Sequence, residues 1–252
     1  MKHVRFAMEG KIVTGFVQNG VIIDESGRQF DSEQIPVWLS PLEPNNLIAL
    51  GPNSKLYVSK CEMDMPDQPI LYQKYNSTLI GHKAPVYYPN GLKTMECEGQ
   101  LGVIIGRTGR NICSNDALSF VRGYTIAHDI SGKDFLSSYF RPPIRAKGQD
   151  TFGPIGPYLV DKEDIIDVKN LNVKTYVNGK LCTEGNTCDL LYGVSELIEY
   201  ISSFMTLYPG DMIWAGTPAV PVSIKIDDIV RTEIEGLGCL ENVVAADWRT
   251  KN

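Results

Sequence analysis

Three oxygen-bearing side chains occur at alternate positions in the segment M-E-C-E-G-Q-L. Glu96, Glu98 and Gln100 are spaced two residues apart and lead into an apolar stretch over residues 100–105 that predicts a strand. Residues two apart in a strand lie on the same face, so these three side chains would converge. Mg²⁺ and Mn²⁺ prefer carboxylate and carbonyl oxygens, which makes a metal site one interpretation. On spacing alone, a solvated strand face is the commoner explanation.

A carboxylate ends the next apolar segment, V-R-G-Y-T-I-A-H-D. A buried Asp129 would need a partner or a metal, and in the latter case it would add a further oxygen ligand. The alternative is an aspartate that caps the turn at Ser131 and Gly132. His128 would point to the opposite face of the strand, so we expect it to be structural.

Two loops could bind the oxygens of an acidic substrate. Arg141, Arg145 and Lys147 lie in the proline-rich segment F-R-P-P-I-R-A-K-G-Q-D, and arginine suits bidentate carboxylate recognition. Gly216 and Thr217 lie in W-A-G-T-P, a tight turn whose N–H groups and hydroxyl could hold a carboxylate or enolate oxygen. Solvated charges and an ordinary turn remain the alternatives.

The elements that must position these residues are mostly strands. Residues 4–31 alternate apolar and polar side chains around tight turns, which predicts a small β subdomain over residues 1–45 and a catalytic domain over residues 46–252. Residues 41–69 look like a connector that could serve as a lid. Asn178-Gly179 predicts a hairpin, and a helical period begins at Ser195. The fold class is therefore α+β and strand-rich, without the βαβ rhythm of a doubly wound sheet.

Composition limits the partners. Of the 252 residues, 43% are hydrophobic and 21% are charged, and the net charge of −6 comes without a basic tract, which disfavours nucleic acid and anionic lipid. No apolar run approaches the ~20 residues that span a bilayer, and no signal peptide is apparent. We expect a cytoplasmic protein with reduced thiols that binds a small molecule. The six cysteines, none in a C-x-x-C pair, are Cys61, Cys97, Cys113, Cys182, Cys188 and Cys239.

Several well-known motifs are missing from the sequence. It contains no G-x-G-x-x-G after a strand, no G-x-x-x-x-G-K-[ST], no H-E-x-x-H and no G-x-S-x-G. Dinucleotide-binding, P-loop, zincin and α/β-hydrolase functions therefore lose support.

An ordered set of segments over about residues 45–246 resembles the fumarylacetoacetate hydrolase family. Within that family, two segments are most similar to the isomerase/decarboxylase branch of homoprotocatechuate (4-hydroxyphenylacetate) breakdown. They are Y-F-R-P-P-I-R-A-K-G-Q-D-T-F-G-P-I-G and T-L-I-G-H-K-A-P. The set comprises E-C-E-G-Q-L-G-V-I-I-G, G-Y-T-I-A-H-D-I-S-G-K-D, K-G-Q-D-T-F-G-P-I-G-P, T-L-Y-P-G-D-M-I-W-A-G-T-P and I-E-G-L-G-C-L-E-N.

The resemblance implies a mixed β-roll, usually dimeric, that binds Mg²⁺ or Mn²⁺ through an E-x-E pair and a later aspartate. Those positions fall on Glu98, Gln100 and Asp129, so an amide stands where the family has a second acid. An amide can supply a carbonyl oxygen, but the lost negative charge lowers the expected metal affinity, for which Glu96 could compensate.

The resemblance also implies the remaining site residues. Lys147 matches the lysine of the K-[SG]-x-D motif and Thr217 the threonine of the G-T-P turn, and both are expected to be catalytic. The candidate substrate-binding residues are Arg141, Arg145, Lys74 and Gly216.

A second departure from the family concerns the reaction. Hydrolytic members carry a histidine, with a glutamate three residues later, after a G-x-N segment, and this dyad activates water. Here Gly51-Pro52-Asn53 is followed by Tyr57 and Lys60 at those positions. Loss of CO₂ from a β-oxo acid does not need that base, because a divalent metal supplies the electron-withdrawing centre. The sequence therefore favours carbon–carbon lyase or tautomerase chemistry.

These observations lead to one main hypothesis and two alternatives. The main one is a metal-dependent decarboxylase, with isomerase activity as a further expectation, of a polycarboxylated 2-oxo acid of aromatic catabolism such as 5-oxopent-3-ene-1,2,5-tricarboxylate. The first alternative is a hydrolase of acylpyruvate or fumarylacetoacetate type, with Tyr57 or another group as the base. The second is a metal-free degenerate subunit that supports an active homologue. A homodimer is expected, or a hetero-oligomer with that homologue under the last alternative.

Overall fold

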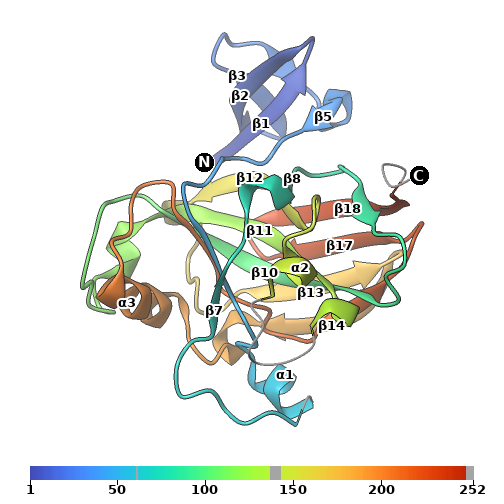
Figure 1. The fold of residues 1–252 in the computed structure, drawn as a ribbon. Helices are drawn as coiled ribbons and strands as arrows, with labels where there is room; N and C mark the ends of the chain where they lie inside the picture. The colour runs from blue at the N-terminus through green and yellow to red at the C-terminus, as the bar shows by residue number, and fades with distance from the viewer. Residues whose placement is uncertain (61, 137–142, 248–252) are drawn as a thin grey trace.

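A computed structural model describes residues 1–60, 62–136 and 143–247 of the chain. Its N-terminal strands, blue in Figure 1, stand on one side of a larger body built from two sheets. The strand-rich α+β prediction is confirmed. The three α-helices of the described residues are α1 (Lys55–Lys60), α2 (Ile144–Lys147) and α3 (Val194–Phe204). Six short 3₁₀ segments accompany them at Ser32–Gln34, Asn76–Thr78, Ala117–Phe120, Lys133–Phe135, Lys162–Asp164 and Thr187–Asp189.

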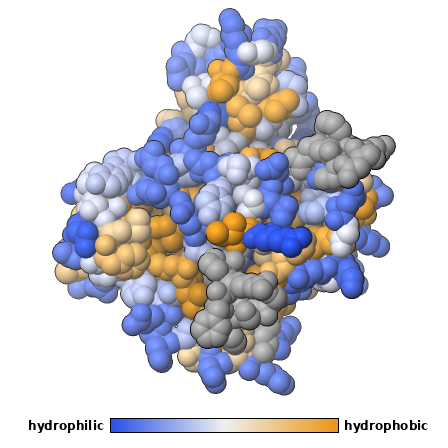
Figure 2. Space-filling view, viewed as in Figure 1, coloured by the Kyte–Doolittle hydropathy of each residue, from blue (hydrophilic) through white to orange (hydrophobic). Residues whose placement is uncertain are grey.

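The N-terminal strands fold on a core of their own. Val4, Phe6 and Ile22 are buried there with Trp38, while Ile12 remains exposed. Hydrophobic side chains also gather on the surface of this unit in the space-filling view (Figure 2). Because β1 pairs with β12, the unit continues the main sheet, and the boundary at residue 45 stays a prediction. The strands are β1 (Lys2–Met8), β2 (Lys11–Gln18), β3 (Val21–Asp24), β4 (Gln29–Phe30) and β5 (Val37–Trp38).

Within the described residues, thirteen strands form the larger sheet, in the order β4-β3-β2-β1-β12-β11-β10-β15-β6-β7; off this path, β5 pairs with β1, β8 with β12 and β16 with β10. β10 and β11 lie at its centre, and nearly all of their residues are buried. A polar side chain on these two strands therefore lies deep in the protein. The strands of the body are β6 (Leu47–Leu50), β7 (Leu71–Gln73), β8 (Leu79–Ile80), β10 (Met95–Ile105), β11 (Val121–Gly132), β12 (Gly153–Asp161), β15 (Met212–Trp214) and β16 (Val222–Ile224).

The second sheet packs against β10 and β11 and closes the roll. It has the strand order β14-β13-β17-β18-β9 in the described residues, and the predicted turn at Asn178-Gly179 joins β13 to β14. The helix predicted from Ser195 begins one residue earlier, at Val194. The strands are β9 (Val86–Tyr88), β13 (Asn172–Val177), β14 (Lys180–Asn186), β17 (Ile229–Ile234) and β18 (Gly238–Ala246).

Two further features of the described residues concern membrane-spanning helices and disulfide bonds. In the described part of the chain, no helix combines the length and hydrophobicity needed to cross a bilayer. The five cysteines that the structure describes are free, and Cys61 lies outside the described residues.

Gly99 is a point of close contact between the two sheets. A Cβ atom at this position would lie 2.6 Å from Oγ1 of Thr175 and 2.6 Å from Oγ1 of Thr232. These two hydroxyls are buried and 2.9 Å apart, so they have little room to move. We expect Gly99→Ala to lower the free energy of unfolding by about 1–3 kcal/mol, measured by denaturant titration. Adding Thr175→Ala and Thr232→Ala should recover part of the loss. An unchanged unfolding midpoint for Gly99→Ala would contradict the close packing.

His82 should make stability depend on pH. Its Nδ1 accepts a hydrogen bond of 3.0 Å from the backbone N–H of Glu241, and its ring meets that of Trp38 edge to face. Burial is the main cause that lowers the pKa of His82 from 6.5 to about 4, and nearby Lys83 adds to the effect. As the pH falls from 6.5 to 4, the unfolded chain binds this proton before the folded chain does. Stability should therefore be lost across that window, by up to roughly 3 kcal/mol.

The matched variant for this test is His82→Gln, whose amide oxygen can accept from Glu241 without titrating. Unfolding free energies at pH 7 and pH 4.5 should differ less for the variant than for the wild type. Parallel losses in the two proteins would show that other groups cause the acid sensitivity.

Candidate functional site

The central strands bring two acids together. β10 and β11 are antiparallel, and their register sets Glu98 directly opposite Asp129. Side chains that are opposite in register lie on the same face of a sheet, so the two carboxylates are neighbours although they are distant in sequence. Asp129 is fully buried and Glu98 is 6% exposed.

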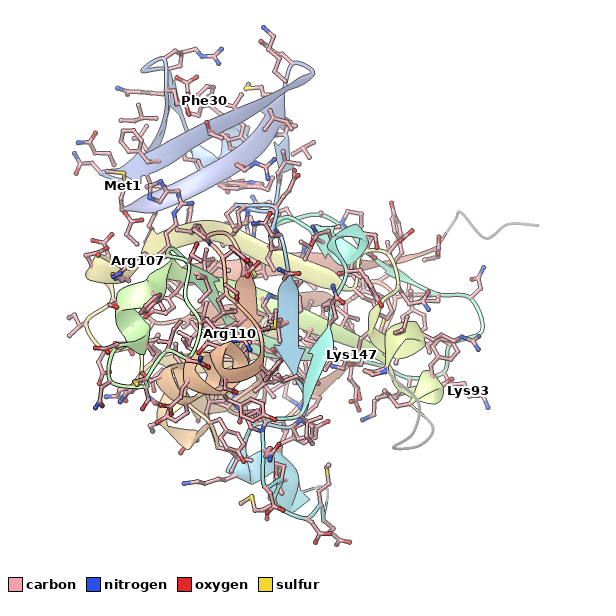
Figure 3. All side chains as sticks on the ribbon, turned by 60° about the vertical axis from the view of Figure 1, so that its left-hand side comes forward. Met1, Phe30, Lys93, Arg107, Arg110 and Lys147 are labelled. Carbon is pink, nitrogen blue, oxygen red and sulfur yellow. The ribbon has the colours of Figure 1, made fainter. Side chains whose placement is uncertain are left out.

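Two lysines neutralise these carboxylates. Nζ of Lys74 lies 2.6 Å from Oδ1 of Asp129, and Nζ of Lys147 lies 2.6 Å from Oδ2 of the same side chain. Lys147 also lies 3.4 Å from Oε1 of Glu98, so that its ammonium bridges both acids. The Tyr72 hydroxyl donates to Asp129 as well. Figure 3 shows Lys147 close to β7, in agreement with the 5.1 Å between its Nζ and the centre of the Tyr72 ring.

Gln100 links the acids to the turn after β15. Its Nε2 donates to Oε2 of Glu98 at 3.1 Å and more weakly to Oδ2 of Asp129 at 3.4 Å. Its Oε1 accepts from the backbone N–H of Gly216 at 3.2 Å. Gly216 has a φ of +81°, and a Cβ atom there would lie 2.8 Å from Cβ of Asn53, so glycine is required for this approach.

The ionisation of the cluster follows from burial and from the two lysines. Burial alone would raise the pKa of Asp129, but Lys147 and Lys74 outweigh it and hold this pKa at about 2. Burial would lower the pKa of Lys147, but Asp129 and Glu98 outweigh it and raise this pKa. Burial raises the pKa of Glu98, against the effect of Lys147. Asp129 therefore stays ionised and Lys147 keeps its proton at neutral pH.

Lys74 differs from Lys147 in its surroundings. Its side chain has no exposed surface, and its Nζ lies 5.1 Å from the centre of the Trp214 ring. Burial lowers its pKa to about 8, although Asp129 acts in the opposite direction. Because Lys74 is fully buried, it is better placed to stabilise the ionised form of Asp129 than to contact a substrate.

A cleft of about 460 Å³ reaches Glu98 and Lys147, while Asp129 lies buried behind them and does not line it. One wall is apolar and includes Met63, Ile70 and Leu136, while Glu98 and Lys147 form its inner end. The volume lies within the range of small-molecule sites. The side chains and backbone that line it belong to Gly51, Pro52, Tyr57, Met63, Ile70, Tyr72, Glu96, Glu98, Ser131, Lys133, Leu136, Pro143 and Lys147.

The carboxylate oxygens of Glu98 and Asp129 suit a hard divalent cation that takes few of its ligands from the protein. The described residues contain no group of three or more His, Cys, Asp or Glu side chains arranged for a metal. Glu98 and Asp129 nevertheless converge, and the ammonium of Lys147 already lies between them. Mg²⁺ is often held by one or two carboxylates, with water and substrate completing its shell, so the residues present fit such an ion.

The remaining predicted site residues, Thr217 and the two arginines, do not all lie beside the two acids. Thr217 is buried, and its Oγ1 accepts from the backbone N–H of Ala219 at 3.3 Å. Arg145 is exposed on α2, with its guanidinium 4.0 Å from the centre of the Phe135 ring, so the structure does not bring it to the acids. Arg141 lies outside the described residues. The substrate-binding roles of both arginines stay predictions.

Sequence reasoning missed Tyr72 and Ser131. Tyr72 could have been found from alternation, because it is two residues before Lys74 and therefore shares its face at β7. Ser131 bears the same relation to Asp129, but the sequence pattern indicates it only in the alternative of a capped turn. His128 is buried beside Asn242 with its pKa lowered to about 3, chiefly by burial, which agrees with a structural role.

Comparisons with known proteins bear on the family and the fold of the chain. The family described as fumarylacetoacetate (FAA) hydrolase, C-terminal, matches residues 46–245. A 4-hydroxyphenylacetate degradation bifunctional isomerase/decarboxylase of Salmonella dublin is 38% identical over 232 residues, which cover 92% of this chain and 53% of that protein. This chain thus spans about half the length of the Salmonella relative. The mitochondrial oxaloacetate tautomerase FAHD2A of Homo sapiens is 34% identical, covering 93% of this chain and 80% of that protein.

Among solved structures, a 5-carboxymethyl-2-hydroxymuconate delta-isomerase from Mycobacterium smegmatis has a TM-score of 0.87 at 30% identity, with 98% of this chain and 99% of that chain covered. The predicted β-roll fold is therefore confirmed. Because the family match covers more than half of the sequence and includes β10, β11 and α2, the chain belongs to the fumarylacetoacetate hydrolase family.

Proposed function

We propose that this chain is a divalent-metal-dependent decarboxylase, with isomerase activity, of a polycarboxylated 2-oxo acid such as 5-oxopent-3-ene-1,2,5-tricarboxylate. The observation that carries the proposal is the pair Glu98 and Asp129, bridged by Lys147 at the inner end of a cleft. The names of the Salmonella and Mycobacterium relatives support the substrate class.

The chain's own residues would bind and orient the acid. Glu98 and Asp129 would hold Mg²⁺ or Mn²⁺, and the amide oxygen of Gln100 would become a further ligand only if the amide turned over, because its nitrogen faces both acids. The bound ion would supply a Lewis acid for the oxygens of the 2-oxo acid. Lys147 would stabilise negative charge that develops on the oxo oxygen, since its ammonium is fixed and kept from bulk water. The apolar wall of the cleft would exclude water while CO₂ leaves.

The histidines argue against hydrolysis as the main reaction. All three lie in described residues, and none of them lines the cleft. His3 pairs with Asp161, His82 accepts from the backbone of Glu241, and His128 is buried beside Asn242. A hydrolase would need another general base, for which Tyr57 is the candidate in the cleft. Its products would be two acids, without CO₂.

One observation favours a second candidate, a metal-free subunit that supports an active homologue. Two lysines already balance the two carboxylates, and the amide nitrogen of Gln100, instead of its oxygen, faces both acids. Such a subunit would bind no Mn²⁺ and show no turnover when purified alone.

The test is an assay of the purified protein with the tricarboxylic oxo acid, in which CO₂ release and ketonisation are followed with Mg²⁺ and then with EDTA. The proposal predicts activity that EDTA abolishes and that added Mg²⁺ or Mn²⁺ restores. Activity that survives chelation would contradict the metal-dependent mechanism, and release of two acids without CO₂ would favour the hydrolase.

A further inference from the structure

Beyond Asp129, Ser131 at the end of β11 and Lys133 just after it carry polar side chains that the proposed chemistry does not use. Asp129, Ser131 and Lys133 are spaced two residues apart, and both Ser131 and Lys133 line the cleft. Ser131 lies opposite Glu96 in the strand register, as Asp129 lies opposite Glu98. A row of side chains therefore leads from the two acids to Ser131 and Lys133, which line the same cleft as Glu98.

The second observation concerns hydrogen bonding by the hydroxyl group of Ser131. Its residue is 3% exposed, and its Oγ has no hydrogen-bond partner among the described residues. A buried hydroxyl without a partner costs free energy, so an unpaired one that faces a cleft indicates a ligand that supplies the missing acceptor or donor.

Lys133 places a cation beside Glu96, the residue opposite Ser131, on a fixed backbone. Its own N–H donates to the carbonyl of Thr94 at 2.9 Å, and the next residue, Asp134, accepts from the N–H groups of Lys93 and Thr94. The ammonium lies 3.2 Å from Oε2 of Glu96, and the Lys133 side chain is 36% exposed. Glu96 uses only part of the hydrogen-bonding capacity of this ammonium, which has three donors.

We propose that Ser131 and Lys133 form a subsite for a second, distal carboxylate of the substrate. This inference rests on the proposed function, because it takes the 2-oxo end of the ligand to lie at Glu98 and Asp129. The Ser131–Glu96 pair lies two residues further along the strands than the Asp129–Glu98 pair, a distance of about 7 Å. A 2-oxo acid of about six carbons with a carboxylate at each end would reach from one position to the other.

Lys133 also determines how Glu96 affects the ligand. In the wild-type protein its ammonium neutralises Glu96, so a substrate carboxylate can approach. Without the ammonium, Glu96 would face the incoming carboxylate with an uncompensated negative charge. Loss of Lys133 should therefore weaken binding of a dicarboxylate through both lost attraction and new repulsion.

The test compares two ligands of equal length, 2-oxoadipate and 2-oxohexanoate, which differ only in the distal group. Their dissociation constants are measured by calorimetry in the presence of Mg²⁺. The wild type should bind 2-oxoadipate about ten- to hundredfold more tightly. Lys133→Met should reduce this preference to near one, Ser131→Ala should reduce it by a smaller factor, and Lys133→Arg should keep most of it.

The outcomes separate the subsite from the proposed function. Equal binding of the two ligands to the wild type, or a preference that survives Lys133→Met, would overturn the subsite while leaving the metal-dependent chemistry intact. Failure of the wild type to bind either ligand would contradict both proposals. Thermal midpoints of the variants should stay near the wild-type value, because Lys133 is partly exposed and Ser131→Ala removes an unpaired hydroxyl.

Discussion

Replacing Asp129 by asparagine is expected to weaken Mn²⁺ binding by about a hundredfold or more and to abolish turnover of the 2-oxo acid. Loss of residues that merely support a metal ligand already costs 10–100-fold, and Asp129 is proposed as a direct ligand. The same change removes the counter-charge of Lys74, which has no exposed surface. Breaking a buried ion pair in this way costs on the order of 3–5 kcal/mol of stability.

A paired variant separates these two effects of Asp129. In Asp129→Asn/Lys74→Met both buried charges are removed, so the unfolding free energy should recover towards the wild-type value. Metal binding and turnover should stay lost, because the carboxylate is still missing. Denaturant titration and Mn²⁺ calorimetry on both variants provide the test. Recovery of metal binding in the double variant would show that Asp129 is structural.

Replacing Gln100 by glutamate should have the opposite effect on the metal. The change adds a third carboxylate at the position where the family has an acid, and it removes the N–H group that faces Glu98 and Asp129. We expect the dissociation constant for Mn²⁺ to fall about ten- to hundredfold, because one further negative charge lies beside the cation. Without metal, the variant should be less stable than the wild type, since three carboxylates then repel one another.

The control for Gln100→Glu is Gln73→Glu. Gln73 is exposed on β7 and points away from Tyr72 and Lys74, so it adds the same charge outside the cluster. Its Mn²⁺ affinity should equal that of the wild type. Weaker or unchanged Mn²⁺ binding in Gln100→Glu would show that this side chain does not face the metal.

The sequence could predict the acids because a regular strand positions them. The two-residue spacing of Glu98 and Gln100 is sufficient to set them on one face, and the structure keeps that face turned towards the cleft. What the spacing could not supply was the pairing of β10 with β11. The register that sets Glu98 opposite Asp129 depends on contacts between segments that are distant in sequence.

The connector over residues 41–69 shows a second limit. It contains the buried strand β6, which pairs in parallel with β15, and the helix α1. A run of four apolar residues, Leu47–Leu50, has no period by which a strand can be told from a helix. Its partner lies far along the chain, so the strand could be recognised only in the folded structure.

The central claim is that Glu98 and Asp129 hold a divalent cation at the inner end of the cleft. A crystal of the protein soaked with Mn²⁺ and oxalate, a planar mimic of an enolate, tests it most directly through anomalous scattering. We predict one Mn²⁺ peak between these two carboxylates, with oxalate in contact with the ion and with the ammonium of Lys147. Absence of a peak at saturating Mn²⁺, or an ion held only by other residues, would contradict the account.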